Sequence, residues 1–420
     1  SGNSYVTGLF SGTASFRNIT LESSGQYDIF VAKLDSSGNW LGANQAGGTG
    51  EDYGFSIAID SSGNSYVTGL FSGTASFRNT NLRSSGNYDI FVAKLDSSGN
   101  WLWAKQAEGD SDSSVKGYGI AIDSSGNSYV TGLFSGTPSF GNTNLISNGY
   151  NDIFVAKLDS SGNWLWAQKA GGTDWDEGIG IATDSSGNSY VTGCFSGTAS
   201  FGNITLTSNG SADIFVAKLD SSGNWLWAQK AGGTDWDKGI SIATDFSGNS
   251  YVTGFFKGIA SFGNITISSS GNADIFVAKL DSSGNWLWAK QAGGTGTDYG
   301  HGITIDSSGN SYVTGCFSGN SSFGNITLES SGYNDIFVTK LNSNGNWQWA
   351  KQAGGTDKDW GYDIAIDSSG NSYVTGCFQE IASFGNTTLI CRENHSIFVV
   401  KLDSTGNWLW AQKAGGTSSD

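Results

Sequence analysis

The sequence predicts an all-β fold, a seven-bladed β-propeller of four-stranded antiparallel blades. The phrase Ser-Gly-Asn-Ser-Tyr-Val-Thr-Gly occurs seven times, with its tyrosines spaced by 61, 63, 61, 61, 61 and 61 residues. Each period holds four short runs typical of strands. Both faces of most runs are apolar, so each small sheet needs cover on both sides, which copies of itself arranged radially provide. An open solenoid would also cover the faces, but a closed ring of seven is favoured.

The second unit shows the expected elements. We expect strand a at 54–60, strand b at 65–72, strand c at 89–96 and strand d at 101–107. Ser-Ser-Gly-Asn turns join a to b and c to d, because glycine supplies a positive φ and the preceding aspartate accepts backbone hydrogen bonds. Both connections are therefore tight hairpins. The longer segment between strands b and c has room for a short extra strand.

The order of strands within a blade has two solutions. The small residues of strand a suit the crowded axis, and the paired tryptophans of strand d suit the wide rim. We therefore expect the order a-b-c-d outward. The order c-d-a-b keeps both hairpins as well and stays open.

The whole chain is expected to be one domain, 1–420, with units that start near residues 1, 53, 116, 177, 238, 299 and 360. Asp420 occupies the repeat position of Asp359, and Ser1 occupies that of Ser62. The equivalent of 53–61, which holds strand a, is missing between them. We therefore expect one composite blade built from both chain ends, with one unfilled strand slot whose occupant is open. Unpaired strand edges invite pairing with another chain.

Net charge limits the partners. The formal charge is −16, which repels a phosphate backbone and an anionic lipid surface. No apolar stretch is long enough to span a bilayer. We expect no nucleic-acid partner and no membrane insertion.

The four cysteines are interpreted as small core residues, because three of them follow a Thr-Gly pair where other units carry leucine or phenylalanine. A disulfide between Cys377 and Cys391, which share a unit, is the alternative. The cysteines are Cys194, Cys316, Cys377 and Cys391.

The repeated motif is that of a known family. DxxGNxYVTGxFxGxAxFG…DIFVAKxDxxGNxxWAxxAGG resembles the SBBP β-propeller repeat of bacterial proteins that are often secreted or surface-associated, and it recurs over essentially the whole chain. The resemblance implies a propeller and an extracellular or cell-surface location. It implies no common enzymatic activity, so it predicts the fold and leaves the function open.

Catalytic groups are scarce. The two histidines, His301 and His395, lie in different units, which argues against a Ser-His-Asp site. The arginines do not form the triple clamp that a sialidase-like site needs, because two of them are equivalent positions in neighbouring units. They are Arg17, Arg78, Arg83 and Arg392. We expect a protein that is not an enzyme and has no catalytic residues.

Paired aspartates recur in the loops between strands d and a. Two carboxylates two residues apart could bind Ca²⁺, although no DxDxDG pattern is present. Turn chemistry and solubility explain them more simply, so we expect no cofactor and no metal site, with calcium as the weaker alternative. The pairs are Asp174 and Asp176, Asp235 and Asp237, and Asp357 and Asp359.

Aromatic residues are the best binding candidates. The tryptophan pairs of strand d are expected to pack between blades. Aromatics in the polar d–a loops have less reason to be buried, and aromatic faces stack on sugar rings. The candidate ligand contacts are Trp175, Trp236, Trp360, Tyr53, Tyr118 and Tyr299.

These observations favour a non-enzymatic extracellular or cell-surface scaffold that binds a protein partner or copies of itself, with self-assembly through the unfilled strand slot. The alternative is a multivalent lectin that binds glycans with its repeated loop aromatics. The sequence fixes neither the ligand nor the oligomeric state.

Overall fold

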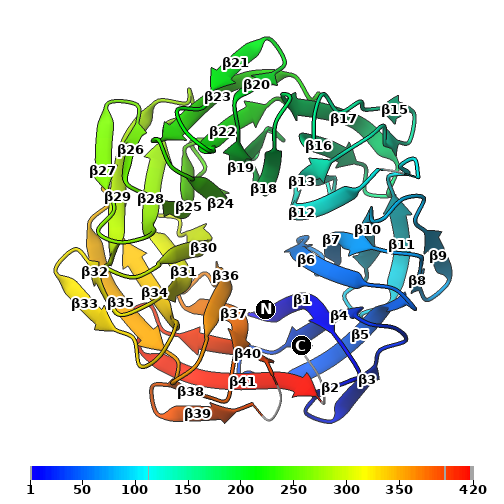
Figure 1. The fold of residues 1–420 in the computed structure, drawn as a ribbon. Helices are drawn as coiled ribbons and strands as arrows, with labels where there is room; N and C mark the ends of the chain where they lie inside the picture. The colour runs from blue at the N-terminus through cyan, green and yellow to red at the C-terminus, as the bar shows by residue number, and fades with distance from the viewer. Residues whose placement is uncertain (1, 112, 392–393, 417–420) are drawn as a thin grey trace.

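The computed structural model describes residues 2–111, 113–391 and 394–416. These residues form seven blades around a central channel, which confirms the predicted all-β propeller (Figure 1). The described part of the chain contains no α-helix, and so no helix long and apolar enough to cross a membrane. Ser1, Asp420 and Arg392 lie outside the described residues, and with them the question of what fills the gap between Asp420 and Ser1.

Strands a and b form the inner half of each blade. Strands a are β6 (Asp52–Ile59), β12 (Val115–Ile122), β18 (Asp176–Thr183), β24 (Lys238–Thr244), β30 (Tyr299–Ile305) and β36 (Trp360–Ile366). Strands b are β1 (Ser4–Phe10), β7 (Ser65–Phe71), β13 (Ser128–Phe134), β19 (Ser189–Phe195), β25 (Ser250–Phe256), β31 (Ser311–Phe317) and β37 (Ser372–Phe378).

Strands c and d form the outer half. Strands c are β4 (Asp28–Leu34), β10 (Asp89–Leu95), β16 (Asp152–Leu158), β22 (Asp213–Leu219), β28 (Asp274–Leu280), β34 (Asp335–Leu341) and β40 (Ser396–Leu402). Strands d are β5 (Trp40–Gly48), β11 (Trp101–Gln106), β17 (Trp164–Gly171), β23 (Trp225–Gly232), β29 (Trp286–Gly294), β35 (Trp347–Ala353) and β41 (Trp408–Gly416).

The strand order is a-b-c-d, with strand a nearest the channel, as in the sheet β6-β7-β10-β11 (Figure 1). All pairings are antiparallel. Each a–b pair contains a bulge at the same place, which in β6 lies between Gly54 and Ser56. A bulge bends the strand and re-aims its side chains, so the bulge residue of each strand a turns toward the neighbouring blade.

The segment between strands b and c holds two short strands rather than one. Each hairpin pairs with strand d of the preceding blade, as β8 does with β5 through Gly47 opposite Ser76. Blades therefore gain two outer strands from the next unit. The hairpins are β2 (Thr13–Phe16) with β3 (Ile19–Glu22), β8 (Thr74–Phe77) with β9 (Thr80–Arg83), β14 (Ser139–Phe140) with β15 (Thr143–Asn144), β20 (Thr198–Phe201) with β21 (Ile204–Thr207), β26 (Ile259–Phe262) with β27 (Ile265–Ser268), β32 (Asn320–Phe323) with β33 (Ile326–Glu329), and β38 (Ile381–Phe384) with β39 (Thr387–Ile390).

The predicted turn chemistry is present. Asp60 Oδ1 accepts hydrogen bonds from the backbone of Ser62 and Asn64, each at 2.9 Å, and Gly63 has a φ of 81°. Asn64 Nδ2 donates to the second oxygen of Asp60 at 2.7 Å. These bonds close the a–b hairpin and lower the pKa of Asp60, although partial burial works against them.

The core lies between blades. One cluster joins Tyr66, Ile90 and Val92 of the second blade to Ile120 and Val130 of the third, all at most 6% exposed. Equivalent clusters recur around the ring. Because each blade buries its faces only against its neighbours, the blades cannot fold as separate units.

A tryptophan crosses six of the seven boundaries between blades in the same manner. The second tryptophan of a strand d, such as Trp103, donates from Nε1 to the carbonyl of Ser160 in the next blade's c–d turn at 3.3 Å. The strand c lysine Lys94 reaches the same carbonyl at 3.5 Å. The strand d tryptophans are therefore packing residues.

The two ends of the chain close the ring through one sheet. Strands β2 and β3 from the first unit pair with β41 of the last, in the order β3-β2-β41-β40-β37-β36. Trp410 Nε1 donates to the carbonyl of Ser36 at 3.2 Å, which repeats the tie found between other blades. The predicted composite blade is confirmed.

The first blade differs from the others. Among the described residues it contains β1, β4 and β5 and no strand a. Its strand d also has Gly42 where the other units carry the second tryptophan. The boundary between the first two blades therefore lacks an indole. A Cβ built at Gly42 would meet no atom within 4 Å, so there is space beside this residue.

We predict that Gly42→Trp raises the midpoint of thermal unfolding. The indole fills the place that tryptophan fills at the other boundaries and can donate to the carbonyl of Ser97, the equivalent of Ser160. The gain should be about 1 to 3 kcal/mol, from buried apolar area and from replacing a strand glycine. Differential scanning calorimetry measures it.

The matched control is Trp166→Gly, which creates the first blade's defect elsewhere and should lower the midpoint. Trp166 donates to the carbonyl of Ser221 at 3.2 Å. If Gly42→Trp has no effect while Trp166→Gly destabilises, the open boundary is already filled and the interpretation is wrong.

Candidate functional site

One face of the ring carries two of the predicted aromatics, Trp175 and Trp236. The d–a loops and the segments before strand c lie side by side there, as parallel bridges such as Asn151 with Trp175 and Ala212 with Trp236 show. The Ser-Ser-Gly-Asn turns lie at the opposite ends of the strands. We call the first surface the loop face.

Trp175 and Trp236 are exposed on the loop face. Their exposed fractions are 50% and 46%. Each immediately precedes a buried aspartate at the start of strand a or next to it, so they occupy equivalent places in neighbouring blades. The edge of Trp236 contacts Phe255, with ring centres 5.6 Å apart, and Lys257 lies 5.8 Å from its ring centre. Both indoles are accessible to a ligand from solvent.

Tyr53, Tyr299 and Trp360 are equivalent residues at the start of strand a and are only partly exposed. Tyr299 packs on Phe255 with ring centres 4.7 Å apart, and Trp360 stacks on His395 at 5.9 Å. Each of these residues contacts a different aromatic neighbour in or beside its own blade. The candidates therefore lie around the ring and do not form one site.

Tyr118 lies at the bulge of β12 and lines the channel rather than the loop face. Its ring centre lies 5.5 Å from that of Phe55. Phe55 in turn contacts Tyr53, and Tyr53 contacts Tyr27, so the four rings form a row. Burial raises the pKa of the Tyr118 hydroxyl above its usual range. The row leads from the loop face into the channel.

The channel contains an apolar cavity of about 990 Å³. Strands a contribute most of its wall, including isoleucines of β18 and β24. Asp363 is the acidic residue of this lining, which otherwise consists of aromatic, aliphatic and small polar groups. Asp363 is exposed to the channel, and desolvation by the surrounding walls raises its pKa to about 6.

The same cavity opens onto the edge of β1. It touches Thr7 and Gly8 of β1 on one side and Thr375 and Ile397 of the last blade on the other. Every residue of β7 is buried, whereas five of the seven residues of β1 are partly exposed. The place that strand a takes in the other blades is therefore open in the first, within the described part of the chain.

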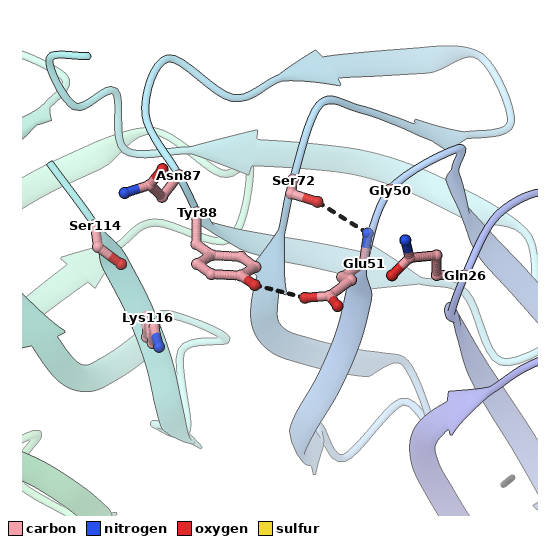
Figure 2. Close-up of a pocket in the computed structure, with 8 residues that line it drawn as sticks. All are labelled: Gln26, Gly50, Glu51, Ser72, Asn87, Tyr88, Ser114 and Lys116. Carbon is pink, nitrogen blue, oxygen red and sulfur yellow. Dashed lines mark hydrogen bonds between the residues drawn. The ribbon is translucent and has the colours of Figure 1, made fainter. Parts of the chain in front are cut away.

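A second, smaller pocket of about 570 Å³ lies on the loop face between the first three units. Its lining is polar: the Tyr88 hydroxyl donates to Glu51, and the Glu51 N–H donates to Ser72 Oγ at 2.9 Å, as Figure 2 shows. Lys116 lies 5.1 Å from the Tyr88 ring centre. Sequence analysis missed this pocket, because its residues come from places where the units differ.

Paired carboxyl groups are buried between strands c and a, and sequence analysis missed their pairing. The aspartate that begins strand c faces the aspartate at or just before the start of strand a of the following unit, across a glycine at the end of strand d. All ten side chains are at most 1% exposed. The pairs are Asp28 and Asp52, Asp152 and Asp176, Asp213 and Asp237, Asp274 and Asp298, and Asp335 and Asp359.

The pair next to Gly171 shows the geometry. Asp176 accepts backbone hydrogen bonds at both oxygens, from Gly172 at 2.7 Å and Ser196 at 3.2 Å. Asp152 Oδ1 has no hydrogen-bond partner, and a Cβ on Gly171 would lie 2.6 Å from it and 2.8 Å from Asp176 Oδ2. Two buried carboxylates that face one space disfavour double ionisation, so a shared proton satisfies the pair.

The metal candidates do not pair as the sequence suggested. Asp176, Asp237 and Asp359 are buried and face strand c, whereas Asp174, Asp235 and Asp357 lie in the loop. Among the described residues no three acidic, histidine or cysteine side chains are grouped to hold a metal ion. The expectation of no metal site, with calcium as the weaker alternative, stays a prediction.

The remaining histidines and cysteines form no catalytic group, although Cys316 Sγ lies 3.9 Å from His301 Nε2. Burial lowers the pKa of His301, at the bulge of β30, to about 4. His395 stacks on Trp360 of the same blade, with ring centres 5.9 Å apart. All four cysteines are buried and none of them forms a disulfide, so the disulfide alternative between Cys377 and Cys391 is not realised. Burial raises the pKa of Cys194 to about 12, which suits a core residue.

Comparison with known proteins identifies the repeat. Five segments match the SBBP family, described as a beta-propeller repeat: residues 43–70, 102–133, 165–193, 287–323 and 348–376. An uncharacterized WD repeat-containing protein, L264, of Acanthamoeba polyphaga mimivirus is 25% identical over 87% of this chain and 32% of its own length. The regulatory protein FlaEY of Caulobacter vibrioides is 27% identical over 47% of this chain and 21% of its own length. The chain thus spans about a third or less of these relatives.

Solved structures resemble this chain only at low identity and with TM-scores below 0.5. A protein of unknown function from Bacteroides caccae has a TM-score of 0.41 and 12% identity over 82% of this chain and 93% of that chain. An apocarotenoid oxygenase of Synechocystis has a TM-score of 0.45 and 8% identity over 98% and 92%. The WD40 domain of Neurospora crassa Pan2 has a TM-score of 0.38 and 12% identity over 87% and 86%.

We predict that the paired carboxyls make the protein less stable as the pH rises from about 4 to about 7. Burial, the main cause, raises the pKa of Asp176 from 3.8 to about 7. Between these two pKa values the folded state keeps its proton whereas the unfolded state loses it. The stabilisation that this proton gives is therefore complete below the pKa of the unfolded state, and it is lost as the pH rises through the pKa of the folded state. Asp152→Asn should flatten the decline, because its amide donates to Asp176 without a proton. Urea unfolding between pH 4 and 8 measures it.

Asp159→Asn is the matched control of opposite sign. Hydrogen bonds within its turn lower the pKa of Asp159, led by the backbone N–H of Asn163. The ionised Asp159 carboxylate stabilises the fold above the pKa that it has in the unfolded state, and this stabilisation is lost as the pH falls. The Asp159→Asn variant has no such carboxylate, so it should be less stable than the native protein near neutral pH. An unchanged pH profile in Asp152→Asn would contradict the shared proton.

Proposed function

Because this chain is built from β-propeller repeats of the SBBP family, we propose that it is a non-enzymatic scaffold that captures an extended strand of another protein chain. The capture site is the open place beside β1, which we call the strand slot: the edge of β1 with Thr375, Ile397 and Asp363 of the last blade opposite. The observation that carries the proposal is the exposure of β1 beside six equivalent strands that are covered.

The slot offers the means to bind a strand. An uncovered strand edge presents backbone donors and acceptors in a fixed register, which an added strand satisfies. The apolar walls are Val6 of β1 and Ile397 and Val399 of the last blade, at most 7% exposed. Backbone pairing would supply affinity, and the pockets for alternate side chains would supply specificity.

The location and the partner are part of the proposal. The SBBP resemblance supports an extracellular or cell-surface protein. WD repeats in the mimivirus relative's name support a scaffold role. No cofactor is needed for strand capture.

Trp175 and Trp236 favour a second candidate, a multivalent lectin. Two accessible indoles at equivalent places give two weak sites on one face, and the polar pocket beside Tyr88 adds donors and acceptors for hydroxyl groups. Repeated weak sites gain affinity through avidity.

We predict that a peptide of residues 52–60, which is strand a of the second unit, binds the protein with micromolar affinity. If copies of the chain supply the captured strand, sedimentation velocity should also show assembly that grows with concentration and is reversed by the peptide. A protein that stays monomeric and still binds the peptide has the slot but takes its strand from a different protein.

The control carries residues 53–60 repeated after Asp420. This extension supplies the strand in cis, so it should abolish both peptide binding and assembly. A monomer to which the unmodified peptide does not bind would overturn the proposed function.

We predict for the lectin alternative that any binding on a glycan array is lost in the double variant Trp175→Ala, Trp236→Ala, because sugar stacking needs the indoles. Phe246→Ser is the control. Phe246 is 89% exposed at the opposite end of the blade, and serine is the residue other units carry there. Binding that survives the double variant, or that requires Phe246, would eliminate the loop-face lectin.

A further inference from the structure

We infer that the polar pocket beside Tyr88 binds a single neutral hexose residue through its hydroxyl groups. The inference goes beyond strand capture and does not depend on it, because it gives the chain a sugar site distinct from the exposed indoles. The pocket volume of about 570 Å³ lies within the range of about 300 to 1,000 Å³ found for small-ligand sites. Its lining belongs entirely to the described residues.

Three side chains of different chemistry meet in this pocket. Glu51 immediately precedes β6, Tyr88 immediately precedes β10, and Lys116 is the second residue of β12. The site therefore lies between the second and third blades, each of which contains all four strands. Figure 2 shows the Tyr88 ring between Glu51 and Lys116. A carboxylate, a phenol and an ammonium group thus surround one space.

No other boundary repeats this combination. The other units carry serine, tryptophan, threonine or lysine at the place of Glu51. The three places hold Ser114, Asn151 and Glu177 at the next boundary. The loop before β12 is also two residues longer than the other d–a loops, and it ends at Ser114, which lines the pocket. A packing role shared by all units would keep the same residues in each, so these differences point to a function of this one boundary.

The pocket has hydrogen-bonding capacity that the fold does not use. The Tyr88 hydroxyl donates to Glu51, and this bond raises the pKa of the hydroxyl, which fixes it as the donor. Within the described part of the chain Lys116 forms no hydrogen bond or ion pair, and its ammonium group lies 5.1 Å from the centre of the Tyr88 ring. Ser114 Oγ also has no partner there. A ligand with several hydroxyl groups would satisfy these groups.

The balance of charge favours a neutral ligand. Glu51 and Lys116 are the one acidic and the one basic side chain of the lining. An ion attracted by one of them is repelled by the other, so it gains little from the pair. A hydroxyl group, in contrast, donates to a carboxylate and accepts from an ammonium group. Neighbouring hydroxyl groups on a hexose ring can fill both roles at once.

The rest of the lining fits a sugar residue better than a smaller alcohol. The exposed amides of Gln26 and Asn87 can each donate and accept, which adds partners for further hydroxyl groups. The partly exposed ring of Tyr88 offers an apolar surface to the C–H groups of a sugar ring. Polar partners on several sides and one aromatic ring together match a hexose.

Saturation-transfer-difference NMR on the full chain tests the inference. The neutral probes are the methyl glycosides of glucose, galactose and mannose. We expect at least one of them to bind with a Kd of about 1 mM. The uronate and the 2-amino sugar of the same configuration should bind about tenfold more weakly, because each meets a like charge in the pocket.

Two variants of similar side-chain size should reverse this selectivity. Glu51→Gln leaves Lys116 as the charged group of the pocket, so the uronate should become the tightest of the three ligands. Lys116→Met leaves Glu51, so the amino sugar should become the tightest. A loss of folding cannot produce such a gain of binding.

The matched controls are Lys238→Met and Glu177→Gln. Lys238 is the equivalent of Lys116 in the fifth blade, and its ion pair with Glu177, at 3.2 Å, lies outside this pocket. Each control removes the same kind of charge as a pocket variant. Both should keep the preference for the neutral hexoside.

The outcomes separate this inference from the two candidate functions. If no neutral hexoside binds, or if Glu51→Gln and Lys116→Met leave the selectivity unchanged, the inference is wrong. It is also wrong if the double variant Trp175→Ala, Trp236→Ala abolishes hexoside binding, since the sugar then binds at the indoles. Binding of the peptide of residues 52–60 should be the same in Glu51→Gln and Lys116→Met as in the native protein, so strand capture is judged separately.

Discussion

Contact between blades is the interaction on which the rest of the structure depends. A sheet of this size has two apolar faces and no means to cover either, so its stability comes from its neighbours. The polar ties follow the same logic. A tryptophan and a lysine of one blade converge on a single carbonyl in the next blade's turn, which fixes the rotation between blades while the apolar clusters supply the free energy. Closure by β2 and β41 gives the end blades the neighbours that an open array would lack.

The fold could be predicted from the sequence because the period, the turns and the two-sided apolar strands all indicate one answer. The hairpin between strands b and c was underestimated, since its four-residue strands are too short to register as strands. Its signal was present: an alternating Thr-Ala-Ser-Phe followed by a turn, where Arg17 and Arg78 take positive φ values of 60° and 57°. The pairing of this hairpin with strand d of the preceding blade could not be predicted, because it depends on the tertiary arrangement.

The candidate site was predictable only in part. Trp175 and Trp236 were identified because polar loops give an aromatic no reason to be buried, and both prove accessible. Their grouping with Tyr118 was not predictable, because a bulge turns that residue into the channel. The paired carboxyls were missed for a similar reason. Asp176 was paired with Asp174, its near neighbour in the chain, whereas folding brings it to Asp152, which precedes it by two strands and their connections.

The exchanged hairpin has a consequence for how such a chain changes over time. Each blade contains strands from two successive units, so no continuous stretch of the gene encodes a blade. Duplication or loss of one full period, begun at any point in the repeat, still leaves every strand d with a hairpin to receive. Lineages can therefore alter the number of units by simple recombination between copies, and the near-identity of the seven units is the condition under which that recombination is most frequent.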